Sequence, residues 1–166
     1  MAQGDKPGHL DRVIEVKRFP VVGIGASAGG LEAVVEFFKA MPDEPGMAFV
    51  LIQHLDPHHQ SLTVDLLQKH TGISVLQAGE GDLVRSDCLF VIPPNCTLTI
   101  KDGLLHLSAP SELRGLRLPI DRFFTSLAED EQERAVAIVL SGTGSDGAQG
   151  LRRVKANGGL VLAQPP

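Results

Sequence analysis

The sequence predicts an α/β fold: a doubly wound, mainly parallel sheet with helices on both faces and one small β-hairpin. Continuous apolar runs at 47–53 and 135–140 are typical of parallel strands that are buried on both faces. A β-branched run at 21–24 precedes 31–41, where apolar residues recur at spacings of three and four, as on one face of a helix. Strands that alternate with helices in this way indicate a parallel sheet.

The other elements follow in order along the chain. Gly72 lies just beyond a helical pattern at about 60–69, as a C-terminal cap does. An Asp-Gly dipeptide at 102–103 separates two strand-like runs, 97–100 and 104–107, and therefore predicts a hairpin. The remaining expected elements are short strands at 73–76 and 88–92, a helix at 120–127, a helix that ends near residue 156 and a final strand at 160–163.

Length and composition narrow the class of protein. The 166 residues fit one domain, expected over 18–166, after a polar tail at 1–17. Hydrophobic content of 43% and charged content of 21% are typical of a soluble globular protein. A net charge of −5 argues against a nucleic-acid partner, and no apolar run is long enough to insert into a membrane. Without a secretory signal and with two isolated cysteines, Cys88 and Cys96, the protein is expected in the cytoplasm.

Ser27 lies in a small-residue turn between the first strand and the first helix. Residues 25–29 read Gly-Ala-Ser-Ala-Gly and match the pattern G-x-S-x-G, which suits a sharp turn that leaves the serine Oγ exposed. The helix that follows directs its first N–H groups and its positive dipole end at this turn. Ser27 is therefore the best candidate nucleophile in the sequence.

Two other interpretations of this turn stay open. Gly23, Gly25 and Ala28 also fit the looser dinucleotide fingerprint G-x-G-x-x-G/A, although Asp43 and Glu44 lie in a Pro-flanked loop where that fingerprint expects an acidic residue at a strand end. The glycines could also serve only tight packing. The sequence contains no nucleoside-triphosphate P-loop.

A serine, a histidine and an aspartate follow three of the expected strands. Ser27 follows 21–24, His54 ends 47–53, and Asp146 lies in the loop after 135–140. The carboxyl ends of parallel strands share one edge of a sheet, so the three side chains are expected in a single crevice. A hydroxyl, an imidazole that takes its proton and a carboxylate that orients the imidazole are what nucleophilic acyl transfer requires.

Each residue also has a simpler interpretation. A histidine at a strand end is often a hydrogen-bonded structural residue, and Asp146 could be a turn former or a helix cap. A metal site is a third interpretation, with the four candidate ligands His54, Asp56, His58 and His59. Pro57 interrupts any helical face there and no second ligand cluster is evident, so we expect neither a metal nor a cofactor.

Five motifs together resemble the catalytic domain of the bacterial chemotaxis protein-glutamate methylesterases (CheB type). They are Gly-Ile-Gly-Ala-Ser-Ala-Gly-Gly at 23–30, Gln-His at 53–54, Val-Ile-Pro-Pro at 91–94, Arg-Leu-Pro-Ile-Asp at 117–121 and Ser-Gly-Thr-Gly-Ser-Asp-Gly-Ala at 141–148. The resemblance covers about residues 20–164. It implies Ser27 as nucleophile, His54 as base and Asp146 as the third member of a triad. Backbone N–H groups at Ala28 and Thr143 are then the implied oxyanion donors.

The resemblance also implies a reaction and partners. The reaction is hydrolysis of glutamate methyl esters, with deamidation of glutamine, on methyl-accepting chemotaxis receptors. Arg114, Arg117 and Asp121 are expected to line the approach of the substrate, and ordinary surface pairing is their alternative role. Two other classes of function stay open: a non-catalytic module that docks a receptor or a sensor kinase, and a dinucleotide-dependent oxidoreductase.

The chain departs from the family pattern at both ends. Residues 1–17 are too few to form the receiver domain that usually precedes the esterase. The chain ends at 164–166, where the family's domain continues through further elements. We therefore expect either a stand-alone enzyme or the N-terminal part of a fusion with a receptor methyltransferase, with a catalytic domain that is truncated at its C-terminus.

Overall fold

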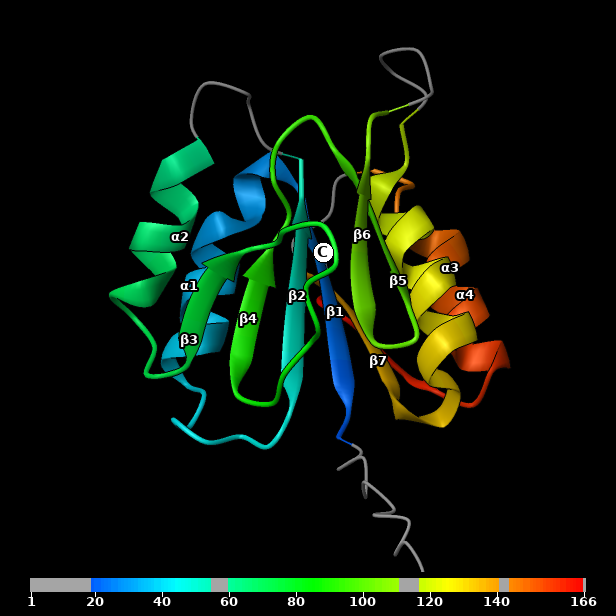
Figure 1. Ribbon diagram of the computed structural model, residues 1–166, viewed down its shortest axis with the longest axis horizontal. Helices are drawn as coiled ribbons and strands as arrows, with labels where there is room; N and C mark the ends of the chain where they lie inside the picture. The colour runs from blue at the N-terminus through cyan, green and yellow to red at the C-terminus, as the bar shows by residue number, and fades with distance from the viewer. Residues whose placement is uncertain (1–18, 55–59, 111–116, 141–143, 166) are drawn as a thin grey trace, which may run out of the picture.

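The computed structural model describes residues 19–54, 60–110, 117–140 and 144–165. Its main sheet has six strands in the order β3-β4-β2-β1-β7-β8, with every pair parallel, and a separate antiparallel pair, β5-β6 (Figure 1). The predicted α/β fold with a small hairpin is thereby confirmed. The elements are β1 (Val21–Ala26), η1 (Ala28–Gly30), α1 (Leu31–Lys39), β2 (Ala48–Gln53), α2 (Gln60–Gln68), β3 (Ser74–Gln77), β4 (Cys88–Val91), β5 (Thr97–Lys101), β6 (Leu104–Ser108), α3 (Pro119–Glu131), η2 (Gln132–Arg134), β7 (Ala135–Leu140), α4 (Ala148–Ala156) and β8 (Leu160–Ala163).

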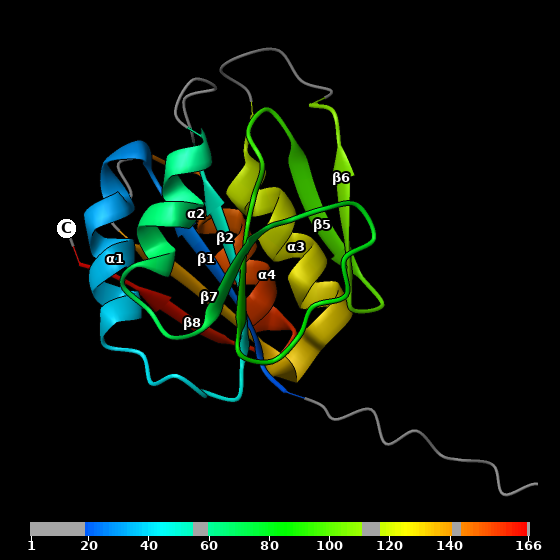
Figure 2. The ribbon, with the colours of Figure 1, turned by 60° about the vertical axis from the view of Figure 1, so that its left-hand side comes forward.

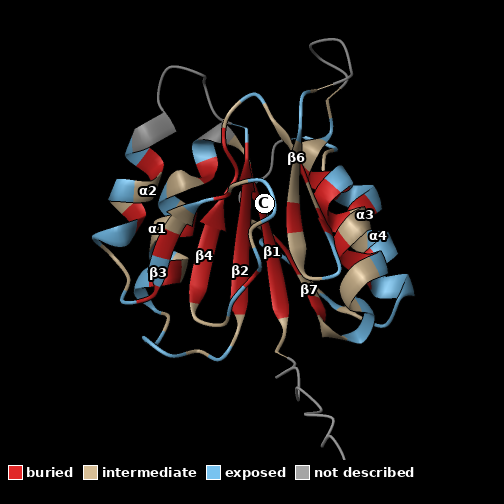
Figure 3. Cartoon of the chain, viewed as in Figure 1, coloured by how far each residue is buried: buried red, intermediate tan, exposed pale blue. Residues whose placement is uncertain are grey.

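Helices cover both faces of the sheet. Helices α1 and α2 lie on one face, while α3, α4 and the hairpin lie on the other (Figures 1 and 2). Alternate residues of a strand point to opposite faces, so β2 sends Phe49 and Leu51 into the core under α1 and α2, and Val50 and Ile52 into the core under α3. The central strands are consequently buried along their whole length, as Figure 3 shows in red.

The loop between β5 and β6 is the predicted Asp-Gly hairpin turn. Asp102 and Gly103 both have positive φ, 52° and 74°, which is what a two-residue turn of type I′ requires. The carboxylate of Asp130, on α3, accepts hydrogen bonds from the backbone N–H groups of Asp102 (2.6 Å) and Gly103 (3.1 Å). The hairpin is thereby fastened to the last turns of α3.

Several boundaries differ from those expected, and two of the larger differences are at β1 and α3. Strand β1 continues to Ala26, so Gly25 belongs to the strand rather than to the turn. Helix α3 runs to Glu131 instead of residue 127, because its buried stripe continues through Ala128. Within the described ranges, no helix combines the length and apolar composition that crossing a bilayer requires.

Gly23 and Gly25 allow α3 to lie directly on β1. A Cβ added at Gly25 would come within 2.6 Å of Ile120 Cγ2, and one added at Gly23 would come within 3.0 Å of Phe124 Cε1. Close packing therefore accounts for both glycines. The packing interpretation of these two residues is the one that the geometry favours.

This packing predicts the outcome of a matched pair of substitutions. Gly25→Ala should lower the free energy of unfolding by about 1–3 kcal/mol, since the new methyl group overpacks against Ile120. Gly29→Ala should leave it within about 0.5 kcal/mol of the parent, because an added Cβ there meets no atom within 4 Å. Urea denaturation of both variants tests the assignment, and equal stabilities would contradict it.

Candidate functional site

The carboxyl ends of three adjacent strands meet at the upper edge of the sheet in Figure 1. Ala26, at the end of β1, pairs with Gln53 of β2 on one side and with Leu140 of β7 on the other. The chain builds the sheet from β1 toward β2 and β4, and later from β1 toward β7 and β8. Such a reversal of strand order creates a crevice at the carboxyl edge, where ligands bind in open α/β sheets.

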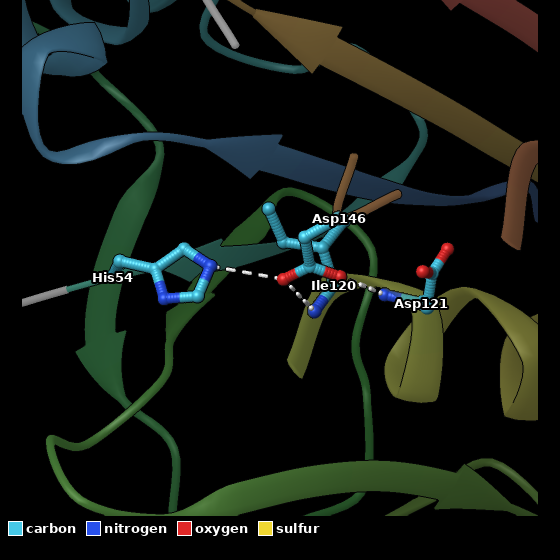
Figure 4. Close-up of polar contacts among 4 residues, drawn as sticks. All are labelled: His54, Ile120, Asp121 and Asp146. Carbon is cyan, nitrogen blue, oxygen red and sulfur yellow. Dashed lines mark hydrogen bonds and ion pairs between the residues drawn. The ribbon is translucent and has the colours of Figure 1, made fainter. Parts of the chain in front are cut away.

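His54 and Asp146 are in direct contact at this edge. Their side chains come from the residue after β2 and from the loop before α4, and His54 Nε2 lies 2.9 Å from Asp146 Oδ2 (Figure 4). An ionised carboxylate can only accept, so Nε2 carries the proton of this hydrogen bond. The other ring nitrogen, Nδ1, is then the basic one. The predicted approach of His54 and Asp146 is confirmed.

Asp146 also caps helix α3. Its Oδ2 accepts a hydrogen bond from the Ile120 N–H (3.1 Å) and its Oδ1 accepts one from the Asp121 N–H (2.9 Å), as Figure 4 shows. These N–H groups belong to the first turn of α3, where the helix itself supplies no acceptor. Asp146 is therefore both a helix cap and the partner of His54. The positive end of the α3 dipole favours the negative charge of its carboxylate.

The residue after Asp146, Gly147, has to be a glycine. Its φ is +105°, in the left-handed region, and a Cβ there would lie 3.1 Å from Ile120 Cγ2. A side chain at this position would meet both an unfavourable backbone conformation and a close neighbour. The glycine lets the chain turn into α4 directly after Asp146 has contacted the end of α3.

Ser27 occupies the position on β1 that corresponds to His54 on β2. It directly follows Ala26, which pairs with Gln53, the residue before His54. Its carbonyl oxygen accepts hydrogen bonds from the N–H of Gly30 (2.8 Å) and from Nε2 of Gln53 (3.4 Å). The first of these bonds closes the turn that begins η1 at Ala28, and the second ties this turn to the end of β2.

A cavity of about 510 Å³ adjoins His54. Its walls are the loop after β4, strand β5 and most of the length of α3, and Arg117 is among its lining residues. Arg117 Nη1 donates to Asn95 Oδ1 at 3.0 Å, which links the chain before α3 to the loop after β4. The cavity therefore lies directly beside the imidazole of His54.

Asp121 has a different environment from the surface position that sequence reasoning gave it. Only 7% of the residue is exposed, and its Oδ1 accepts a hydrogen bond from the N–H of Gly150 (2.7 Å), in the first turn of α4. Asp121 lines the cavity but its carboxylate is engaged in a buried contact. For Asp121, the alternative of ordinary surface pairing is wrong. Arg114 and Thr143 lie outside the described residues, so their expected roles stay predictions.

The described side chains form no cluster that suits a metal ion. No group of three or more His, Cys, Asp or Glu comes together within the described ranges. Asp56, His58 and His59, the other candidate ligands, lie outside these ranges. Cys88 is buried and Cys96 is partly buried, and both are free thiols.

Sequence reasoning missed two contributors to this edge. Gln53 appeared only as part of a motif, yet it is buried and its side chain bonds to the Ser27 turn. A polar residue that ends an otherwise apolar strand was the available signal. The pairing of Asp121 with Gly150 had no signal, because it depends on how closely α3 and α4 approach.

This edge of the sheet thus combines a hydrogen-bonded histidine–carboxylate pair, His54 and Asp146, with a serine, Ser27, that follows the neighbouring strand. A family model described as CheB methylesterase matches residues 22–166. The chain belongs to the CheB methylesterase family.

Individual relatives agree with this assignment. The chain is 34% identical over 154 residues to protein-glutamate methylesterase/protein-glutamine glutaminase 2 of Pseudomonas syringae, an alignment that covers 92% of this chain and 46% of the relative. It is 34% identical over 166 residues to protein-glutamate methylesterase/protein-glutamine glutaminase of Mesorhizobium japonicum, an alignment that covers 97% of this chain and 49% of the relative. The crystal structure of the Thermotoga maritima CheB methylesterase catalytic domain superposes with a TM-score of 0.78 at 25% identity, covering 87% of this chain and 78% of that one. The chain thus spans about half the length of the relatives from Pseudomonas syringae and Mesorhizobium japonicum.

Proposed function

We propose that this chain hydrolyses γ-methyl esters of glutamate side chains on methyl-accepting chemotaxis receptors, in the cytoplasm. One observation carries the proposal: in a member of the CheB methylesterase family, His54 is hydrogen-bonded to Asp146 at the same sheet edge at which Ser27 directly follows the neighbouring strand. A receptor methyltransferase and a sensor kinase are the further partners that we infer for such an enzyme. No cofactor is needed for ester hydrolysis by this route.

The proposed reaction starts with a proton transfer to His54. As Ser27 Oγ attacks the γ-carbonyl carbon, its proton passes to Nδ1, the ring nitrogen that Asp146 does not engage. The C–O bond to the methoxy group then breaks, and methanol leaves with the proton that Nδ1 returns. Water attacks the resulting acyl-serine by the same route and releases glutamate and the free Ser27 hydroxyl.

Charge compensation in this scheme comes from the groups around Asp146 and Ser27. The imidazolium formed during attack lies 2.9 Å from the Asp146 carboxylate, which two backbone N–H groups of α3 hold in place. We assign the developing oxyanion to the backbone N–H groups of Ala28, at the start of η1, and of Thr143. An oxyanion donor of this kind typically contributes 10²–10³-fold to the rate.

The substrate is proposed to approach over the cavity beside His54. Arg117, held by Asn95, lines that cavity and supplies a positive charge for the acidic surface of a receptor helix, and we assign the same role to Arg114. Glutamine is the second proposed substrate, with ammonia as the leaving group in place of methanol. The two relatives from Pseudomonas and Mesorhizobium carry both activities in their names.

Methanol release from a methylated receptor fragment tests the proposal. We expect release by this chain above the rate of the fragment in buffer alone, and ammonia release from the corresponding glutamine-containing fragment. The unmethylated fragment is the control, because it has no methoxy group to lose. Binding of the fragment without any release would contradict hydrolysis and favour a docking module. Tight NAD binding that persists in Ser27→Ala would instead favour the oxidoreductase.

A further inference from the structure

Helices α3 and α4 cap each other at their N-termini. Asp146, in the loop before α4, accepts hydrogen bonds from the Ile120 and Asp121 N–H groups of α3. Asp121, in the first turn of α3, accepts a hydrogen bond from the Gly150 N–H of α4. Each helix therefore supplies the acceptor that the first turn of the other one lacks.

We propose that Asp121 is a positioning residue for the hydrolysis, which fixes the Asp146 carboxylate against His54 by holding the first turn of α4. The inference rests on the proposed function for its kinetic consequence. It assigns Asp121 no contact with the substrate, since its Oδ1 is already engaged and the residue is 7% exposed.

The packing around Gly150 shows how closely the two first turns are joined. A Cβ added at Gly150 would lie 2.5 Å from Phe124 Cβ and 3.2 Å from the Asp121 Cα. At this separation the short Asp121 side chain reaches the Gly150 N–H at 2.7 Å. A longer or shorter side chain at residue 121 could not make the same bond without moving one of the helices.

The contacts close a ring that includes Asp146. The Asp121 N–H binds Asp146, the chain passes through Gly147 into α4, and the Gly150 N–H returns to the Asp121 carboxylate. Movement of Asp146 away from His54 would have to break or stretch a bond of this ring. A misplacement of about 1 Å in a reacting group can cost about 10²-fold in rate, so the ring bears directly on the reaction.

Asp121→Ala opens the ring, and Asp130→Ala is its matched control. Asp130 lies on the same helix and also accepts backbone N–H bonds from another element, but it holds the hairpin turn instead of α4. We expect Asp121→Ala to lower kcat about 10- to 100-fold with KM within about 2-fold. Asp130→Ala should leave kcat within about 2-fold, and Asp121→Asn, which keeps an Oδ1 acceptor, should recover most of the lost rate.

Amide hydrogen exchange at Ile120 reports the position of Asp146 without any substrate. Its N–H is bonded to Asp146 Oδ2, so we expect exchange at least about 10-fold faster in Asp121→Ala and unchanged in Asp130→Ala. If Asp121→Ala does not fold, Asp121→Ser replaces it, because serine suits the first turn of a helix but is one bond too short to reach Gly150.

Three results separate the possible outcomes. Faster Ile120 exchange together with lower kcat supports the positioning role. Ile120 exchange and kcat that both match Asp130→Ala would overturn it. If the parent chain itself releases no methanol, the proposed function is refuted. Faster Ile120 exchange in Asp121→Ala would then still support the coupling between Asp121 and Asp146.

Discussion

Ser27→Ala should lower methanol release from a methylated receptor fragment by at least about 10³-fold. The substitution removes the only atom that forms a covalent bond to the substrate in the proposed route, and removal of a triad serine in other enzymes costs up to about 10⁶-fold in kcat. KM should change little, because the cavity that is proposed to receive the substrate is lined by other residues. The measurement is steady-state methanol release at several fragment concentrations.

Ser27→Ala needs a control for folding and one for background activity. Alanine suits the position, since Ser27 has the ordinary extended backbone angles φ −72° and ψ 170°. Circular dichroism and urea denaturation should therefore match those of the parent chain. Equal methanol release by the parent and the variant would contradict the assignment of Ser27 as nucleophile.

Asp146→Asn should reduce both activity and stability. Three donors converge on this carboxylate, namely His54 Nε2 and the backbone N–H groups of Ile120 and Asp121. An amide offers one acceptor oxygen and places an NH₂ group against at least one donor. The equivalent substitution costs about 10⁴-fold in kcat in the serine-protease triad, and we expect about 10³- to 10⁴-fold here. Loss of the cap should cost about 1–2 kcal/mol of stability.

His54→Gln is the matched comparison for Asp146→Asn. It should lower kcat to a similar extent, because it removes the proposed base. It should leave the free energy of unfolding within about 0.5 kcal/mol of that of the parent chain. The reason is that the His54 side chain is 43% exposed and caps no helix. Equal losses of stability in both variants would contradict the dual role of Asp146.

Much of the fold could be predicted because its signals are local. The apolar runs of β2 and β7 indicate strands buried on both faces, and Asp102-Gly103 indicates a two-residue hairpin turn. The end of β1 was misplaced, since Gly25 looks like a turn residue. Its true role, to admit Ile120, depends on a helix nearly a hundred residues later in the chain.

Some features of the candidate site could likewise be predicted from the sequence, and others could not. The meeting of His54 with Asp146 could be predicted, because residues after parallel strands share one edge of the sheet. The ring nitrogen that contacts Asp146 and the buried pairing of Asp121 with Gly150 could not be predicted. Both depend on distances between side chains and helix ends that no sequence spacing specifies.

In the proposed reaction, Ser27 carries the acyl group between the release of methanol and the attack of water. The most direct measurement is to mix the chain with a methylated receptor peptide, quench the reaction in acid within its first turnover, and map the adduct by mass spectrometry. We predict an ester between the peptide's γ-carbonyl and Ser27, absent from His54→Gln and from Ser27→Ala. An adduct on another residue, or undiminished methanol release by Ser27→Ala, would contradict the claim.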